Sequence, residues 1–132
     1  MTDKQTLFTY RLKLAEETLL DAKNMLQNNL SSRSIVNRIY YSMFYAILAI
    51  FLKSDINIKT SKHSGAISLF DKEFVHTGKI DKLYSKNLHK LFNARIDGDY
   101  KDFAEFSRED TSEFIKLAEE FLREIKRLIN ID

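Results

Sequence analysis

The sequence predicts an all-α protein, an up-down antiparallel four-helix bundle with one additional short helix. Its 132 residues include no proline and only three glycines, so residues that interrupt helices are scarce. Apolar residues recur at spacings of three and four, which places them on one face of each helix. Turn signals separate these periodic segments at short intervals, as the connections of an antiparallel bundle require. We expect residues 1–132 to form one domain.

The first two helices are expected at residues 4–28 and 32–53. Apolar residues in the first repeat at alternating spacings of four and three, which gives one apolar stripe along an amphipathic helix. The serine pair that follows it, Ser31 and Ser32, offers an N-cap for the second helix.

The second predicted helix is apolar on nearly all sides beyond Arg38. Its most apolar run covers residues 39–52, whereas a membrane-spanning helix needs about 20 residues. We therefore expect this helix at the centre of the bundle or against a second subunit, and not in a membrane.

The remaining elements are a short helix and two longer helices. A loop at residues 55–61 leads to the short helix, which begins at His63 and ends before 76–78, where a glycine suits a left-handed helix end. Longer helices are expected at residues 81–94, capped by Asp81, and 109–129.

The connections carry expectations of their own. Ile56 and Ile58 in the first loop should pack onto the core. Asp97-Gly98-Asp99 has the composition of a turn, and residues 100–108 fit either a loop or a first helical turn.

Charge and motif searches exclude several classes of site. A formal net charge of +2 is too small to argue for nucleic-acid binding by itself. Neither glycine-rich phosphate-loop motif occurs, and the three histidines lie thirteen residues apart, unlike the ligands of a helical metal site. We expect no metal and no cofactor. The absence of cysteine and of an apolar leader at the N-terminus favours a cytoplasmic protein.

One candidate site lies early in the second helix. Arg38, Tyr41 and Tyr45 are spaced by three and four residues, so they share one helix face. A structural role would pair a buried arginine with a carboxylate and bond the tyrosine hydroxyls at the edge of the core. The alternative is a polar pocket in which guanidinium and phenol groups bind a phosphate or a base.

A second candidate site surrounds Arg95. If a helix ends there, its dipole favours a cation, and Asp97 or Asp99 would hold the guanidinium.

Three motifs occur in one order along the chain. They are N-R-x-Y-Y-S-M-F-Y-A from Asn37, K-H-S-G-A-I-S-L-F-x-K-E-F-V-x-T-G-K from Lys62, and R-x-x-x-D-Y from Arg95. Together they resemble the small stand-alone branch of the HEPN domain family, over about Leu7 to Leu128. The resemblance implies an up-down helical bundle that forms a homodimer. It also implies a partner, a minimal nucleotidyltransferase encoded by a neighbouring gene, in a toxin–antitoxin or related defence pair.

Active members of this family are metal-independent ribonucleases with an R-x(4–6)-H motif near the end of a helix. Histidine would act as acid and base, and arginine would stabilise the charge of the transition state. In this sequence the positions five to seven residues after Arg95 hold Tyr100, Lys101 and Asp102. We therefore do not expect ribonuclease activity from this motif.

A binding role remains for the family's functional corner. Arg95, Asp99 and Tyr100 occupy it and are candidates for a ligand or partner surface, with Tyr100 a candidate acceptor of nucleotidyl groups from the partner. His63 and Ser64 match the K-H-S-G stretch and are expected to cap the short helix.

Three hypotheses follow. The first is a non-catalytic homodimer that binds nucleotide, RNA or the nucleotidyltransferase. The second is a ribonuclease with an altered site, built from Arg95, Tyr100 and either His89 or His63. The third is a structural interaction bundle.

Overall fold

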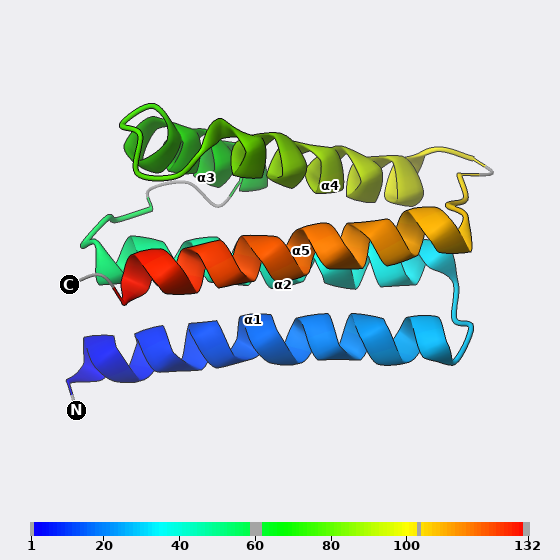
Figure 1. Ribbon diagram of the computed structural model, residues 1–132, viewed down its shortest axis with the longest axis horizontal. Coiled ribbons are helices and arrows are strands. Elements are labelled where there is room, and N and C mark those ends of the chain that lie inside the picture. Colours follow the sequence, from blue (N-terminus) through cyan, green and yellow to red (C-terminus); the bar gives the residue numbers. More distant parts are fainter. Residues whose placement is uncertain (1, 59–61, 103, 131–132) are drawn as a thin grey trace.

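The computed structural model describes residues 2–58, 62–102 and 104–130, and all its regular elements are helical. The long helices are α1 (Asp3–Gln27), α2 (Ser32–Lys53), α4 (Lys82–Tyr100) and α5 (Arg108–Ile129). They run in alternating directions and form an up-down bundle (Figure 1). A short helix, α3 (His63–Phe70), continues into one π-helical turn, η1 (Asp71–Val75), before α4. The predicted all-α class with one additional short helix is confirmed.

Side-chain caps begin the long helices. The Ser31 hydroxyl accepts a hydrogen bond from the Ser34 amide at 3.2 Å, and the Asp81 carboxylate accepts one from the Leu83 amide at 2.8 Å. Both caps were expected from the sequence, because serine and aspartate satisfy amides that the first helical turn leaves unpaired.

The expected cap of α3 is wrong. Lys62 is the N-cap residue, and its side chain makes no capping hydrogen bond. Ser64 is exposed, and the His63 imidazole is bonded to a side chain of α2 instead.

Helix α2 lies at the centre of the bundle, where it contacts α1, α4 and α5. By length and composition it could cross a membrane, but 61% of its apolar segment is buried inside the bundle. Its apolar side chains therefore serve as the core of the protein, as residues 39–52 predict. Ile56 and Ile58, in the loop after α2, pack against this core as expected, whereas residues 59–61 lie outside the described part.

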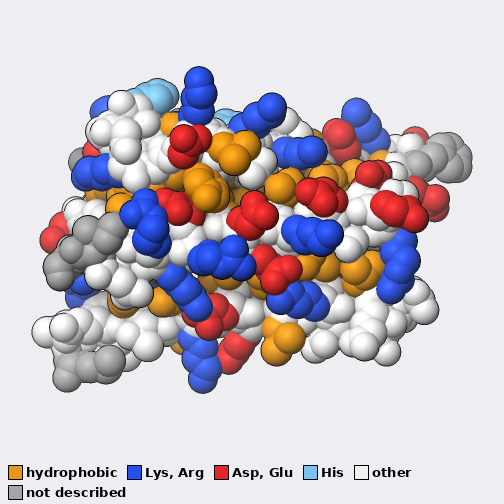
Figure 2. All heavy atoms as spheres, in the orientation of Figure 1, with side chains coloured by type: hydrophobic (Ala, Val, Ile, Leu, Met, Phe, Trp, Pro, Cys, Tyr) orange, Lys and Arg blue, Asp and Glu red, His pale blue; other side chains and the backbone are white. Residues whose placement is uncertain are grey.

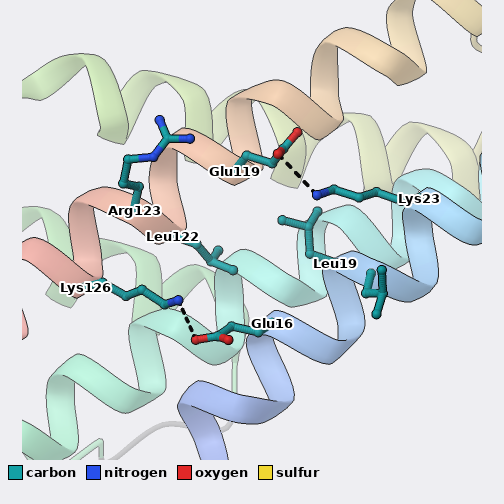
Figure 3. Close-up of a pocket in the computed structure, with 8 residues that line it drawn as sticks. Glu16, Leu19, Lys23, Glu119, Leu122, Arg123 and Lys126 are labelled. Carbon is teal, nitrogen blue, oxygen red and sulfur yellow. Dashed lines mark hydrogen bonds and ion pairs between the residues drawn. The ribbon is translucent and has the colours of Figure 1, made fainter.

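Helices α1 and α5 are joined across an apolar seam (Figure 3). Leu19 and Leu122 are buried beside each other in the lining of a surface pocket. Two ion pairs span the same seam, Lys23 with Glu119 at 3.2 Å and Lys126 with Glu16 at 2.7 Å. Exposed pairs of this kind contribute only about 0–1 kcal/mol each, so the leucines carry most of the contact.

The turn predicted at Asp97-Gly98-Asp99 is wrong, because α4 continues through these residues to Tyr100. Gly98 is buried, and its carbonyl oxygen accepts a hydrogen bond from Arg33 Nε at 2.5 Å. Contact with the start of α2 thus holds the last turn of α4 in a helix that its composition disfavours. The chain leaves this helix at Lys101, and α5 begins one residue earlier than predicted.

We expect Gly98→Ala to stabilise the protein. A Cβ at Gly98 would meet Phe106 and Arg33 at 3.7–3.8 Å, which is ordinary van der Waals contact. Alanine should raise the free energy of unfolding by roughly 0.5–1 kcal/mol, because it restricts the unfolded chain and favours helix. The matched control is Gly78→Ala, which should have the opposite sign because Gly78 has φ +78°. Urea unfolding of both variants measures the difference, and a destabilised Gly98→Ala protein would contradict this account.

Charges are unevenly distributed over the surface (Figure 2). Lysine and arginine side chains stand along α4 on the face shown, whereas acidic side chains gather where the chain passes from α4 into α5. The net charge of +2 therefore conceals two regions of opposite sign.

Candidate functional site

Two arginines from different helices pack on one tyrosine. The guanidinium carbon of Arg38 lies 5.0 Å from the ring centroid of Tyr41, and that of Arg95 lies 5.7 Å from it. Arg95 Nη1 also donates a hydrogen bond to the Tyr41 hydroxyl at 3.3 Å. The structure thus brings together residues from both candidate sites of the sequence, through cation–π contacts that fix the two guanidinium groups.

Arg95 is embedded among aromatic side chains. Its guanidinium carbon lies 5.0 Å from the ring of Tyr40 and 5.7 Å from that of Phe92. Its Nε is buried and has no hydrogen-bond partner in the described structure. The expectation that Asp97 or Asp99 holds this arginine at a helix end is wrong, because α4 continues past it and Asp97 pairs with Lys101 at 3.3 Å.

Arg38 is held by an amide and not by the carboxylate that a structural role would require. Its Nε and Nη2 donate hydrogen bonds to Asn37 Oδ1 at 3.2 and 3.0 Å. The neutral amide orients the guanidinium without cancelling its charge. Tyr45 extends the cluster, since its ring centroid lies 5.8 Å from that of Tyr41.

Arg33 is a further cation that the sequence analysis missed. Its Nε is bonded to the Gly98 carbonyl, and it lies with Arg38 and Asp99 along one surface groove. This groove has a volume of about 510 Å³ and is lined by Met25, Ser31, Arg33, Ser34, Asn37, Arg38 and Asp99. The sequence predicted a helix that includes Arg33 but did not indicate its contact with Gly98, because α4 was expected to end before Gly98.

Arg38 contacts Tyr41 together with Arg95 and lines the groove together with Arg33, and we call these three arginines the arginine corner. Among the residues that the structure describes, none of the three forms an ion pair with a carboxylate. Three positive charges held by neutral groups favour binding of an anion.

Asp99 and Tyr100 have different surroundings although they are neighbours. Asp99 lines the groove with Arg33 and Arg38. Tyr100 is 80% exposed and lies five residues after Arg95, which turns it about 140° away around the helix axis. The R-x-x-x-D-Y motif therefore divides between a groove and an open surface.

His63 joins the cluster from α3. Its Nδ1 lies 2.8 Å from the Tyr40 hydroxyl, and its ring stacks on Phe44 with centroids 4.1 Å apart. Burial raises the pKa of Tyr40, so this hydroxyl stays protonated. Burial first, and the charge of Arg95 second, lower the pKa of His63, which favours the neutral imidazole. The sequence offers no spacing signal for this contact, because it depends on how α3 packs against α2.

The lowered pKa of His63 predicts a pH-dependent stability. Unfolded His63 takes up a proton near pH 6.5, whereas folded His63 does so only at lower pH. Because the unfolded state binds more protons in this window, the free energy of unfolding should decrease as the pH falls below about 6.5. Urea unfolding at about pH 7.5 and about pH 5.5 measures this loss. The decrease in the free energy of unfolding should be smaller in His63→Asn than in the wild-type protein and unchanged in His76→Asn. Equal decreases in the wild-type protein and both variants would contradict this prediction.

His89 is engaged elsewhere. Its Nε2 lies 2.7 Å from Asp71 Oδ2, and the same carboxylate accepts a hydrogen bond from Ser85 at 2.6 Å. This network joins η1 to α4, so of the two histidines considered with Arg95 the structure brings only His63 to it.

Comparisons with known proteins agree with the architecture. A model of the HEPN domain matches residues 8–128. A "UPF0332 protein" of Thermotoga maritima is 40% identical over 129 residues, which cover 98% of this chain and 96% of that protein. Two proteins of Methanocaldococcus jannaschii, named "Putative toxin MJ0142" and "Putative toxin MJ0605", are each 34% identical. These matches cover 86% and 89% of this chain, and 76% and 85% of the two relatives. The fold and the residues matched together show that the chain belongs to the HEPN domain family.

Proposed function

We propose that this protein is the HEPN component of a toxin–antitoxin or related defence pair and that it binds RNA at the arginine corner. The observation that carries the proposal is that Arg38 shares Tyr41 with Arg95 and the surface groove with Arg33, and that none of the three forms an ion pair with a carboxylate among the described residues. The two relatives named as toxins support the assignment to such a pair.

Phosphodiester groups suit this corner better than a neutral ligand does. Guanidinium groups donate several hydrogen bonds to phosphate oxygens, and these bonds are strong because both partners are charged. Tyr41 fixes two of these guanidiniums through its ring, so their charges are held in place for the phosphates of the ligand. Single-stranded RNA presents successive phosphodiester groups on a flexible backbone, so it is the favoured ligand.

A titration with fluorescein-labelled single-stranded RNA tests this proposal. Fluorescence anisotropy should report binding at low salt that weakens as salt is added, because each phosphate contact releases counterions. Three arginine–phosphate contacts predict a slope of about −2 for log K against log salt, at about −0.7 per contact. Absence of binding at low salt would refute the proposal.

A ribonuclease with an altered site is the second candidate, favoured by the position of His63. In this protein Arg95 and His63 both contact Tyr40, so a charge-stabilising group and a titratable imidazole lie in one cluster. No histidine follows Arg95 at the spacing of the motif, so a protein in which His63 takes no part in catalysis would bind RNA without cleaving it. Electrophoresis of RNA after incubation distinguishes the two: cleavage by the wild-type protein that is lost in His63→Asn favours the ribonuclease, and intact RNA favours binding alone.

The binding unit in this proposal is a homodimer. Tyr41, Tyr45, Leu48 and Leu52 follow one another on α2 at spacings of four, three and four residues, and all are half-buried. We call these four residues the α2 stripe. A two-fold axis would pair two such stripes and bring two arginine corners to one interface, since Tyr41 belongs to both features.

A minimal nucleotidyltransferase partner is a further part of the proposal, and we place both proteins in the cytoplasm. Tyr100 is exposed at the end of α4, so its hydroxyl is accessible to a partner enzyme. In the proposed transfer this hydroxyl attacks the α-phosphorus of a nucleoside triphosphate held by the partner, pyrophosphate leaves, and the phenolic proton passes to solvent. Co-expression with the product of the neighbouring gene, followed by peptide mass spectrometry, checks this. A nucleotidyl mass on Tyr100 that is lost in Tyr100→Phe is expected, and an unmodified peptide would count against it.

A further inference from the structure

The groove at the start of α2 contains one acidic side chain among cations. Asp99 comes from the last turn of α4, and Arg33 and Arg38 come from the first turns of α2. No ion pair or hydrogen bond involves the Asp99 carboxylate in the described part of the chain. Two free acceptor oxygens therefore lie beside guanidinium groups in a groove of about 510 Å³, a volume suited to a nucleotide.

We propose that this groove recognises a guanine base of the bound RNA and that Asp99 determines this specificity. The inference rests on the proposed RNA binding and names the base that the site prefers. A carboxylate accepts hydrogen bonds through two neighbouring oxygens. Guanine presents two neighbouring donors, N1–H and the N2 amino group, on its Watson–Crick edge, so both oxygens gain a partner.

The other bases fit this carboxylate less well. Adenine and cytosine place one amino donor beside a ring nitrogen acceptor, which would face the second oxygen of Asp99. Uracil has one donor between two carbonyl acceptors. In each case a lone pair on the base opposes the carboxylate charge, and a polar group left without a partner weakens binding.

The arginines complete the pattern of donors and acceptors. Arg33 uses its Nε on the Gly98 carbonyl, and Arg38 uses its Nε and Nη2 on Asn37. Both Nη groups of Arg33 and Nη1 of Arg38 have no hydrogen-bond partner in the described structure, so they can donate to guanine O6 and N7 or to a phosphate. Met25 gives the groove an apolar wall for the face of the base.

Short RNAs of defined sequence test this specificity. Fluorescein-labelled UUGUU, UUAUU, UUCUU and UUUUU are titrated with the full chain by anisotropy. The wild-type protein should bind UUGUU about tenfold more tightly than the other three. Asp99→Asn should abolish this preference by weakening UUGUU binding, because an amide presents only one acceptor. It should not weaken binding of the other three RNAs, since the variant removes a negative charge from beside the phosphates.

Asp102→Asn is the matched control. It removes the same charge from an exposed position outside the groove lining, so the preference for guanine should persist. Equal affinity of the wild-type protein for all four RNAs would overturn the inference and leave RNA binding intact. A preference that survives in Asp99→Asn would also overturn it. Failure to bind any of the four would refute the proposed RNA binding itself, and the guanine inference with it.

Discussion

Replacing Arg95 with methionine is expected to weaken RNA binding by about 10- to 100-fold while leaving the protein at least as stable. Hydrogen bonds to charged groups contribute about 1.5–3 kcal/mol, which corresponds to this range in affinity. The guanidinium of Arg95 is packed over Tyr40 and Phe92, and its buried Nε has no partner in the described structure. Desolvation of this group opposes folding, and a methionine of similar length would keep the aromatic contacts without that penalty.

The opposite signs of the two effects make this variant informative. RNA titration measures the affinity, and thermal unfolding measures the stability of the same preparation. Arg123→Met removes a charge from an exposed position on α5, so it should change neither property strongly. A variant that loses stability but keeps its RNA affinity would assign Arg95 to a structural role, as the third hypothesis from the sequence requires.

The second large effect is expected on assembly. Leu48→Glu places a carboxylate in the middle of the α2 stripe, where a second copy would have to bury it without a partner. We therefore expect the wild-type protein to elute as a dimer and the variant as a folded monomer of 15.5 kDa. Leu48 is only half-buried within its own chain, so the bundle should tolerate the change.

Light scattering coupled to size exclusion gives the two masses, and circular dichroism checks that the variant is folded. Leu20→Glu is the matched control, because Leu20 is 55% exposed and belongs to α1. A wild-type protein that is already monomeric at high concentration, or a Leu48→Glu variant that remains dimeric, would exclude the α2 stripe as the interface.

The long helices could be predicted because their signal is local. Apolar spacing placed α1, α2 and α5 to within about one residue of their observed bounds, and Ser31 and Asp81 marked the starts of α2 and α4. The end of α4 could not be predicted in this way. Gly98 favours a turn by composition, whereas in the structure it is helical and bonded to Arg33, 65 positions away in the sequence.

The candidate site was predictable in part. Spacing alone put Arg38, Tyr41 and Tyr45 on one face of α2, and this grouping agrees with the structure. The meeting of this face with Arg95 depends on the packing of α4 on α2, which periodicity does not encode. Arg33 was missed for the same reason, since its partner Gly98 comes from another helix. His63 was one of two histidines considered with Arg95, and its contact with Tyr40 of α2 could not be read from spacing.

The hydrogen bond between Arg33 and the Gly98 carbonyl has a consequence for dynamics. It ties one wall of the groove to the terminal turn of α4, and terminal turns open and close readily. When this turn frays, the hydrogen bond from Arg33 to Gly98 breaks, and Asp99 no longer has a fixed position in the groove. A ligand that contacts both side chains must therefore stabilise the helical form of this turn, and fraying of the turn must in return shorten the residence time of the ligand.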